Sequence, residues 1–280
     1  MTYSTLITAD ALGRQRDDSW VLLDCRFELT DIEAGHRDYL TGHLEGAHYA
    51  HLDRDLSGPI EPGVTGRHPL PDSMRFRTLV ASWGITPDTQ VVAYDQGHGA
   101  FAARAWWLLR YHGHAKVAVL NGGLAAAREA GLPLSKAVPV RATGTYPNAD
   151  PLVRATVADD ILGSLAEGTA PALVDARANE RYRGLVEPLD PVAGHIPTAR
   201  NRHFQANLDD SGRFRPADDL RADFLAFGLP EKQVHYCGSG VTAAHNLLAM
   251  EAAGLSGASL YPGSWSEWIT DPSRPVESEG

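Results

Sequence analysis

The sequence is poor in cysteine and has no long apolar run. Its 280 residues include only two cysteines, Cys25 and Cys237, too few for a disulfide framework and typical of a protein that keeps its thiols reduced. No uncharged apolar stretch approaches the ~20 residues of a membrane span, and Met1 is not followed by a basic region and an apolar stretch. We therefore expect a cytoplasmic protein with no membrane partner.

Positive charge is also scarce. The 25 lysines and arginines face 35 aspartates and glutamates, which gives a net charge of −10 with histidine neutral. Such a balance repels a phosphate backbone, so nucleic acid is not an expected partner. Hydrophobic residues make up 43% of the chain and charged residues 21%, which excludes wholesale disorder. The length suits two domains of about 100 to 150 residues each.

Signals for a bound nucleotide or metal are absent too. No Gly-x-Gly-x-x-Gly turn follows the first apolar run of either half, and no Walker-type Gly-Lys-Ser/Thr occurs. The 12 histidines include a group at positions 36, 43, 48 and 51. Their spacing fits neither a helical ligand pair with a third ligand nor a cysteine-containing zinc pattern. We expect no metal and no organic cofactor.

What the sequence does contain is one internal repeat. Two short apolar runs, residues 21–26 and 172–177, end in Asp-x-Arg about 150 positions apart. The segments Gly42-His43-Leu44 and Gly194-His195-Ile196 follow at nearly the same spacing. Both halves therefore present the same elements in the same order.

The repeated elements alternate between helix and strand patterns. Helices are expected at 9–16, 74–84, 100–111, 157–165, 218–228 and 242–253, and strands at 21–26, 90–95, 172–177 and 233–237. A last strand and turn is expected at 117–123 and at 258–263. This alternation predicts an α/β fold of two tandem domains, each a parallel sheet with helices on both faces. We expect these domains at residues 1–132 and 152–280, joined by a linker at 133–151 that is rich in Pro, Ala and Thr.

The two halves differ most in the loop that follows the strand at 90–95 or 233–237. The first loop runs from Asp95 as Asp-Gln-Gly-His-Gly-Ala, and the second from Cys237 as Cys-Gly-Ser-Gly-Val-Thr. Two glycines let backbone N–H groups converge on Cys237, and the N-terminus of the following helix adds a positive field. Such a place lowers the pKa of a thiol and favours a nucleophilic thiolate or a bound anion. The alternative is a cysteine that serves only as a small buried hydrophobe.

These motifs resemble a known family. The loop at 237–243, the paired Asp-x-Arg strand ends, the paired Gly-His segments and the closing Gly-Ser-Trp-Ser-Glu-Trp at 263–268 are similar to those of tandem rhodanese-domain sulfurtransferases, over nearly the whole chain. The resemblance implies a catalytically silent N-terminal domain, which Asp95 fits. It also implies a C-terminal domain in which Cys237 takes a sulfane sulfur as a persulfide. The implied partners are a small-molecule sulfur donor and a thiol, thioredoxin-like or cyanide acceptor.

The loop sequence also bears on the donor. Loops of the form Cys-Gly-Ser-Gly-Val-Thr resemble those of 3-mercaptopyruvate sulfurtransferases, whereas thiosulfate-preferring rhodaneses tend to have basic residues there. We expect the loop to hold the persulfide through the N–H groups of Gly238, Ser239, Gly240, Val241 and Thr242 and through the Ser239 and Thr242 hydroxyls. Because the loop offers no cation to doubly charged thiosulfate, 3-mercaptopyruvate is the expected donor and thiosulfate the alternative.

An anionic donor also needs a cationic anchor. By resemblance, Arg181, directly before Tyr182, matches the family's substrate-binding arginine, and Arg177 lies nearby at the strand end. For Arg177 the alternative is a pair with a structural carboxylate, and Arg183 is expected to be a solvated surface charge. Many mercaptopyruvate enzymes have a second arginine in the following loop, which here reads Glu-Pro-Leu-Asp-Pro at 187–191.

Two residues of the first half are candidates for the cleft between the domains. Phe27 lies where relatives often present a tryptophan, and is expected either as an apolar wall over the sulfur or as a core aromatic. His43 matches a histidine proposed in mercaptopyruvate enzymes to work with the loop serine in proton transfer. Its twin His195 favours the alternative that both histidines support a turn. The role of Cys25 stays open.

Two other functions are compatible with a cysteine in an anion-binding loop. A cysteine phosphatase needs an arginine six residues after the cysteine, and this sequence has Ala243 there. A persulfide carrier or binding module would hold sulfur on Cys237 only for a partner protein. Turnover of small donors and acceptors distinguishes such a module from an enzyme.

Overall fold

The computed structural model describes residues 2–279, which fold into two compact units. Unit 1 contains residues 2–58, 71–152 and 209–214. Unit 2 contains residues 59–70, 153–208 and 215–279. Each half of the sequence thus builds most of one unit, but residues 59–70 of the first half belong to unit 2.

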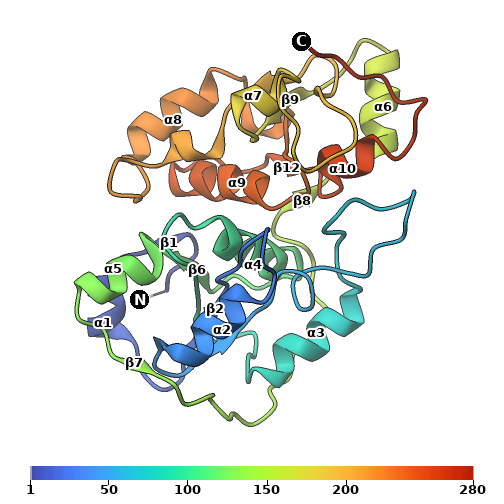
Figure 1. The fold of residues 1–280 in the computed structure, drawn as a ribbon. Coiled ribbons are helices and arrows are strands. Elements are labelled where there is room, and N and C mark those ends of the chain that lie inside the picture. The colour runs from blue at the N-terminus through green and yellow to red at the C-terminus, as the bar shows by residue number, and fades with distance from the viewer. Residues whose placement is uncertain (1, 280) are drawn as a thin grey trace. The chain divides into compact units, whose positions relative to one another are not determined.

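Unit 1 is built on a parallel five-stranded sheet (Figure 1). Its strands, in spatial order, are β1 (Leu6–Ile7), β6 (Val117–Leu120), β5 (Val91–Tyr94), β2 (Val21–Asp24) and β4 (Ala47–Tyr49). The helices are α1 (Ala9–Gln15), α2 (Ala34–Thr41), α3 (Ser73–Ser82), α4 (Ala100–Tyr111) and α5 (Gly123–Glu129), and a two-stranded ladder joins β3 (His43–Leu44) to β7 (Leu134–Ser135).

Both faces of the unit 1 sheet are covered. Leu22 and Val92 pack on one face together with Leu12 of α1 and Leu124 of α5. Their neighbour Leu23, whose side chain points to the other face because strand side chains alternate, is also fully buried. Helix α4 packs on β5 and β6. This burial on both sides explains why the strands read as continuous apolar runs.

Unit 2 repeats this plan. Its parallel strands, in the same spatial order, are β8 (Arg154–Ala155), β12 (Ser259–Leu260), β11 (Gln233–Tyr236), β9 (Ala172–Asp175) and β10 (Arg200–Asn201). The helices are α6 (Ala158–Ala166), α7 (Asn179–Tyr182), α8 (Ala217–Leu225), α9 (Thr242–Ala252) and α10 (Ser264–Trp268), with 3-10 turns η1 (Phe204–Asn207) and η2 (Pro230–Lys232). The matching strand order confirms the predicted repeat and the α/β fold.

The core of unit 2 is rich in tryptophan. Leu173 and Val234 pack with Ile161 of α6 and with Trp265 and Trp268 of α10. Helix α9 packs on β11 and α8. The last strand and turn of each predicted repeat are therefore followed by a helix. In unit 2 that helix is α10, which packs on one face of the sheet.

Residues 133–151, the expected linker, contain only the short strand β7 and otherwise have no regular secondary structure. They pack along unit 1. The side chain of Arg141 donates to the carbonyl oxygen of Trp20 at 2.7 Å, the N–H of Gly144 donates to that of Ala81 at 2.7 Å, and Tyr146 is buried. This stretch is therefore held by specific contacts.

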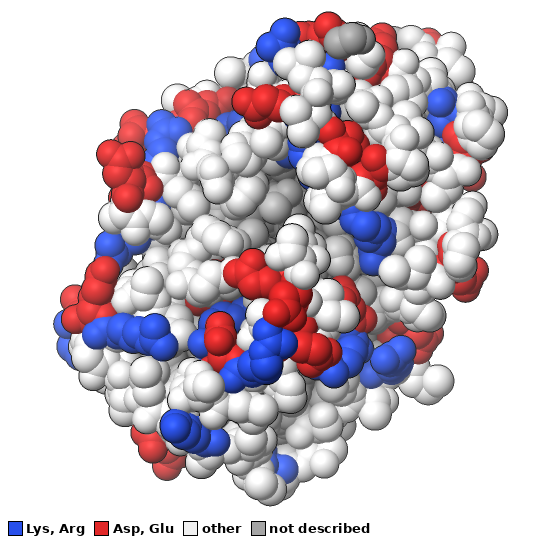
Figure 2. Space-filling model, in the orientation of Figure 1, with Lys and Arg blue, Asp and Glu red and all other residues white. Residues whose placement is uncertain are grey.

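The surface carries both signs of charge. On the face shown in Figure 2, lysines and arginines lie among aspartates and glutamates. Among residues 2–279, no helix has the length and apolar character that a membrane crossing requires.

Candidate active site

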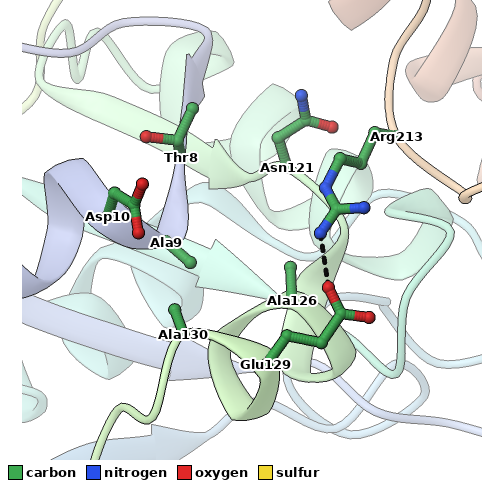
Figure 3. A pocket seen from close by; sticks show the side chains of 8 residues that line it. All are labelled: Thr8, Ala9, Asp10, Asn121, Ala126, Glu129, Ala130 and Arg213. Atoms are coloured by element: carbon green, nitrogen blue, oxygen red, sulfur yellow. Dashed lines mark hydrogen bonds and ion pairs between the residues drawn. The ribbon is translucent and has the colours of Figure 1, made fainter.

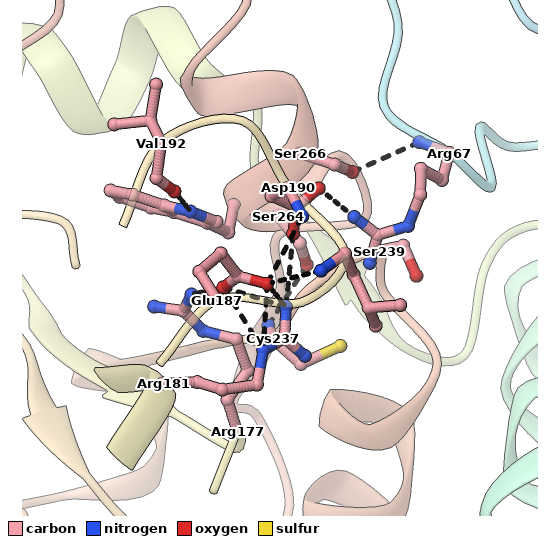
Figure 4. A network of polar contacts seen from close by, with 12 residues as sticks. Arg67, Arg177, Arg181, Glu187, Asp190, Val192, Cys237, Ser239, Ser264 and Ser266 are labelled. Carbon is pink, nitrogen blue, oxygen red and sulfur yellow. Dashed lines mark hydrogen bonds and ion pairs between the residues drawn. The ribbon is translucent and has the colours of Figure 1, made fainter. Parts of the chain in front are cut away.

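Cys237 follows the last residue of β11 and begins the loop that leads into α9. The residue is 2% exposed, and its backbone is fixed by α10: the N–H of Cys237 donates to the Ser264 hydroxyl at 3.1 Å, and its carbonyl accepts from the N–H of Trp265 at 3.0 Å. Figure 4 shows the sulfur at the edge of a network of polar side chains. The strand-to-helix position predicted for Cys237 is therefore the observed one.

The loop surrounds the sulfur with hydrogen-bond donors. The N–H of Gly240 donates to Sγ at 3.2 Å. Burial raises the pKa of the Cys237 thiol, but hydrogen bonds from the Thr242 hydroxyl and from the backbone N–H groups of Ser239, Ala243 and Gly240 outweigh it, so that the pKa is lowered. The cradle can therefore stabilise a thiolate or another anion at this point.

The corresponding loop of unit 1 already contains an anion. The Asp95 carboxylate accepts N–H groups from Gly97 at 3.0 Å, Gly99 at 2.9 Å, Phe101 at 3.0 Å and Ala102 at 3.4 Å. Asp95 is fully buried. In unit 1 the Asp95 carboxylate thus takes the place that the Cys237 sulfur has in the equivalent loop of unit 2.

Cys25, the other thiol, lies in a different environment. Its burial, together with the charges of Asp24, Asp95 and Asp55, holds the pKa of this thiol well above the ordinary value. A cysteine of this kind stays protonated and unreactive at neutral pH.

His68 is a site residue that the sequence did not identify. Its Nδ1 lies 2.7 Å from the Oγ of Ser239, and both residues are buried. His68 belongs to the segment 59–70 that unit 2 takes from the first half of the chain. Gly66-Arg67-His68-Pro69 lies in a long stretch without a helix or strand pattern. The length of this stretch could have identified His68 as a candidate, because long ordered loops in compact domains are often functional.

His43 makes the contacts expected of its second candidate role, support of a turn. Its Nδ1 lies 2.8 Å from the carbonyl oxygen of Tyr39 and its Nε2 lies 3.2 Å from that of Ala137, within unit 1. Its ring stacks on Tyr39 at 3.8 Å, as the ring of His195 stacks on Tyr182 at 4.0 Å. In both units the Nδ1 atom of the histidine contacts the carbonyl oxygen of the tyrosine on which its ring stacks, so the two histidines support the same turn.

Phe27 takes the second of its two expected roles. It is 1% exposed and its ring contacts those of His51 and Phe101 edge to face, with centroids 5.2 and 5.5 Å apart. Within unit 1 the structure therefore places it as a core aromatic.

For Arg177, a candidate substrate-binding residue, the structure shows the alternative contact, a pair with a structural carboxylate. Its side chain is 1% exposed and donates to Asp175, with Nη2 at 2.7 Å from Oδ2, and to the carbonyl oxygen of Gly194 at 2.6 Å. Arg26 makes the same pair with Asp24 in unit 1. The same ion pair occurs in unit 2, which has Cys237, and in unit 1, which has Asp95 at the equivalent position. The pair therefore has a structural role.

Arg181 stands closer to the cysteine loop but is paired with two acidic side chains. Its Nη2 lies 2.8 Å from Oε1 of Glu187 and 3.1 Å from Oδ2 of Asp190. Both carboxylates come from the loop at 187–191, for which only the lack of a second arginine was expected. Figure 4 shows Glu187 between Arg177 and Arg181.

Arg67 completes this cluster from the segment 59–70. Its Nη1 donates to Oδ1 of Asp190, and its backbone N–H donates to the Ser266 hydroxyl at 3.0 Å (Figure 4). A Cβ atom at Gly238 would lie 2.8 Å from Nη2 of Arg67 and 3.5 Å from Nη1 of Arg181. Two guanidinium groups therefore lie beside the residue that follows the cysteine, although the loop has no basic residue of its own.

Away from the cysteine loop, unit 1 has a hollow with a volume of about 370 Å³ (Figure 3). Asn121 and Arg213 line it, and Arg213 pairs there with Glu129 at 2.6 Å. Its eight lining residues include no cysteine and no histidine. Within residues 2–279, no group of three or more His, Cys, Asp or Glu side chains is placed to hold a metal ion.

Comparison with known proteins gives the family. Residues 8–130 and 158–271 each match the family described as the rhodanese-like domain. A Pseudomonas aeruginosa protein, provisionally named 3-mercaptopyruvate sulfurtransferase, is 49% identical over 99% of both chains. A Mycobacterium tuberculosis protein, provisionally named thiosulfate sulfurtransferase SseB, is 40% identical over 97% of this chain and 96% of its own.

A solved structure agrees with these sequence matches. The 3-mercaptopyruvate sulfurtransferase SseA of Escherichia coli superposes with a TM-score of 0.80 over 95% of this chain and 100% of its own, at 31% identity. The two matching units, the internal repeat and the sequence matches all indicate the same family. The chain is therefore a member of the rhodanese family, an enzyme of the sulfurtransferase class with two rhodanese-like domains.

Proposed function

We propose that this enzyme moves a sulfane sulfur from 3-mercaptopyruvate to a thiol acceptor or to cyanide through a persulfide on Cys237. The observation that carries the proposal is the thiol itself. Hydrogen bonds lower its pKa although it is buried, and the only other cysteine has its pKa raised. The cysteine position of unit 1 holds Asp95, so we assign the N-terminal domain no covalent step.

The first half-reaction forms the persulfide. The Cys237 thiolate attacks the sulfur of mercaptopyruvate, the S–S bond forms, and the C–S bond breaks with its electron pair passing to carbon as the enolate of pyruvate. The proton of the donor's thiol is then needed on that carbon. The Ser239 hydroxyl, held by His68 at 2.7 Å, is placed in the cysteine loop to pass this proton. No oxidant is required, because the sulfur gains oxidation state as the carbon is reduced.

The second half-reaction regenerates the Cys237 thiolate. An acceptor thiolate or cyanide attacks the outer sulfur, and the Cys237 thiolate leaves with the electron pair of the S–S bond. The N–H groups that lower the pKa of Cys237 also stabilise this leaving thiolate. A small thiol or a thioredoxin-like protein suits the step, and the need for a reduced cysteine supports a reducing compartment such as the cytoplasm.

Two donors compete in this proposal. The name of the Pseudomonas relative and the neutral loop at 238–242 favour 3-mercaptopyruvate. Thiosulfate is the second candidate, because Arg67 and Arg181 bring positive charge beside Gly238 and because the Mycobacterium relative bears that name. Glu187 and Asp190 offset the charge of the two arginines, so the single carboxylate of mercaptopyruvate remains the better match.

The test is a pair of cysteine variants. Cys237→Ser should abolish sulfur transfer, and the matched control Cys25→Ser should keep most of it, because only Cys237 has a stabilised thiolate. Intact-mass analysis after treatment with mercaptopyruvate should show about 32 Da added at Cys237. Normal turnover without that added mass would falsify the persulfide route.

The anchoring of the donor is tested at Arg181. Arg181→Ala should raise KM for mercaptopyruvate roughly 10- to 100-fold, as expected for loss of a charge-assisted contact. Arg183→Ala is the control, because the Arg183 side chain is exposed and pairs with Glu279. Equal effects at both positions would show that Arg181 does not hold the donor.

A further inference from the structure

Ser264, the first residue of α10, has a backbone conformation that residues with a side chain rarely adopt. Its φ angle is +55°, in the left-handed region, and the residue is fully buried. Among residues 2–279, Thr198 is the only other non-glycine residue with a positive φ. A Cβ atom makes this conformation unfavourable, and it persists only where the surrounding structure imposes it.

The hydroxyl of Ser264 lies between two backbone groups. It accepts the N–H of Cys237 at 3.1 Å (Figure 4), and it donates to the carbonyl oxygen of Tyr261 at 2.9 Å. A hydroxyl has a single hydrogen, so the bond to Tyr261 leaves its lone pairs for Cys237. The left-handed backbone thus brings a fixed acceptor to the N–H of the cysteine.

The next two residues of α10 hold the carbonyl groups that follow. The N–H of Trp265 donates to the carbonyl oxygen of Cys237 at 3.0 Å, and the N–H of Ser266 donates to that of Gly238 at 2.9 Å. In a planar trans peptide, the C=O and the following N–H point in opposite directions. Carbonyl groups turned toward α10 therefore turn the N–H groups of Gly238 and Ser239 away from α10. The N–H of Ser239 is one of the groups that lower the pKa of the Cys237 thiol.

Unit 1 offers an internal comparison. Gly123, the first residue of α5, has the same φ of +55° as Ser264. The N–H of Leu124 donates to the carbonyl oxygen of Asp95 at 2.9 Å, the same contact that α10 makes with Cys237. Glycine adopts this backbone without strain. Unit 1, with a carboxylate in its loop, therefore has glycine here, whereas unit 2 has a strained serine whose hydroxyl binds the cysteine.

We propose that Ser264 is a positioning residue for sulfur transfer, whose hydroxyl fixes the backbone of Cys237 so that the loop directs its N–H groups at the sulfur atom. This inference deepens the proposed function and rests on Cys237 as the sulfur-accepting residue. Ser264 acts through the backbone of the loop rather than on the donor. The strain at Ser264 is retained because a glycine would leave the buried N–H of Cys237 without this acceptor.

The test uses two variants of the full chain, in a Cys25→Ser background. Ser264→Ala removes the hydroxyl and keeps the Cβ atom, and Ser264→Gly removes both the hydroxyl and the strain. The rate of Cys237 alkylation by iodoacetamide is measured against pH. In both variants the midpoint of the profile should rise by roughly 0.5 to 1 pH unit, as expected for loss of one neutral hydrogen bond from the thiolate cradle.

Urea unfolding separates this role from a merely structural one. Ser264→Gly should be at least as stable as Ser264→Ala, because glycine is unstrained at φ +55°. If Ser264 only maintained the fold, the better folded Ser264→Gly would keep the alkylation profile of the unaltered protein. Thr198→Gly is the matched control, because Thr198 is exposed and has a φ of +68°. It relieves the same kind of strain and should leave the profile unchanged.

Two outcomes would overturn the proposal. One is an unchanged alkylation profile in both Ser264→Ala and Ser264→Gly. The other is an equal rise of the midpoint in Thr198→Gly, because relief of backbone strain anywhere in unit 2 would then be the cause.

Failure of the proposed function gives a different pattern, since alkylation needs no sulfur donor. If mercaptopyruvate adds no sulfur to Cys237 of the unaltered enzyme but the midpoint still rises in both Ser264 variants, Ser264 positions the loop and the assigned donor is wrong. If mercaptopyruvate adds the sulfur and the midpoint does not move in the variants, the donor stands and the role of Ser264 is wrong.

Discussion

The Nδ1 atom of His68 lies 2.7 Å from the Oγ atom of Ser239, a residue 171 positions further along the chain. The serine belongs to the loop that surrounds the Cys237 sulfur, and the histidine belongs to a segment that the first half of the chain contributes to unit 2. The pair thus brings a group capable of proton transfer to the loop.

The first prediction concerns this pair. His68→Gln and Ser239→Ala should each lower kcat with mercaptopyruvate roughly a hundredfold, because a proton must reach the carbon that becomes the methyl group of pyruvate. With thiosulfate the fall should be only a few-fold, since sulfite leaves as an anion without a proton transfer to carbon.

The control and the contrary outcome use the same two donors. His36→Gln, at a half-buried position beside Glu33, should leave both rates near those of the unaltered enzyme. Equal losses with both donors would mean that the pair only maintains the shape of the loop. The kcat of the double variant with mercaptopyruvate should be no lower than that of the less active single variant, as expected for residues that act together.

The second prediction concerns the pH at which Cys237 becomes reactive. The Thr242 hydroxyl lowers the pKa of the Cys237 thiol, so Thr242→Val should raise that pKa and reduce the thiolate fraction at neutral pH. Alkylation by iodoacetamide at pH 7, in a Cys25→Ser background, should slow roughly tenfold.

Thr242→Ser is the matched variant, because it keeps the hydroxyl. Its rate profile against pH should follow that of the unaltered protein, while the profile of Thr242→Val moves to higher pH. A profile that stays in place in Thr242→Val would assign the lowered pKa to the backbone N–H groups alone.

The third prediction separates Arg177 from Arg181. Arg177→Ala leaves the buried Asp175 carboxylate without its partner, which should lower the free energy of unfolding by about 3 to 5 kcal/mol. Urea unfolding measures this loss, and Arg183→Ala, at an exposed pair, should change it by less than about 1 kcal/mol. Arg177→Ala with unchanged stability and a raised KM would instead place Arg177 against the donor.

The fourth prediction concerns Asp190. Asp190→Asn removes one negative charge from the pair of arginines beside Gly238, so the site becomes more positive. The ratio of kcat/KM values should then move several-fold toward thiosulfate, the donor with the greater negative charge. Asp160→Asn, at an exposed position in α6, is the control, and the same change of ratio in that variant would show a general charge effect.

The sequence predicted most of the fold because the relevant signals are local. Helix α4 spans Ala100–Tyr111, as expected from its apolar pattern, and α9 ends at Ala252, one residue before the expected end. The strands proved shorter than the apolar runs, since Arg26 and Arg177 turn back to bond the preceding aspartates. Periodicity and the internal repeat therefore predicted the order and type of the central strands and the longer helices. The short edge strands β1, β4, β8 and β10 and the helices α2, α5, α7 and α10 were not predicted.

The sequence also identified where the cysteine lies. A thiol at the end of an apolar run, followed by Gly-Ser-Gly and a helix, has few conformations open to it, and the observed loop places N–H groups on the sulfur. The contrast between Asp95 and Cys237 was visible for the same reason, because the two loops align within the repeat.

Only the tertiary structure decided which charged and polar side chains accompany that cysteine. Arg67 meets Asp190 across 123 positions of sequence, His68 meets Ser239 across 171, and neither pair leaves a periodic signal. The sequence favoured Arg181 as the anchor by resemblance but left open whether Arg177 pairs with a structural carboxylate, since both follow the same strand and carry the same group. Burial separates them: Arg177 is enclosed by Asp175 and Gly194, whereas Arg181 keeps N–H groups free beside Gly238, because the path of the folded chain, not residue type, sets which partners each guanidinium can reach.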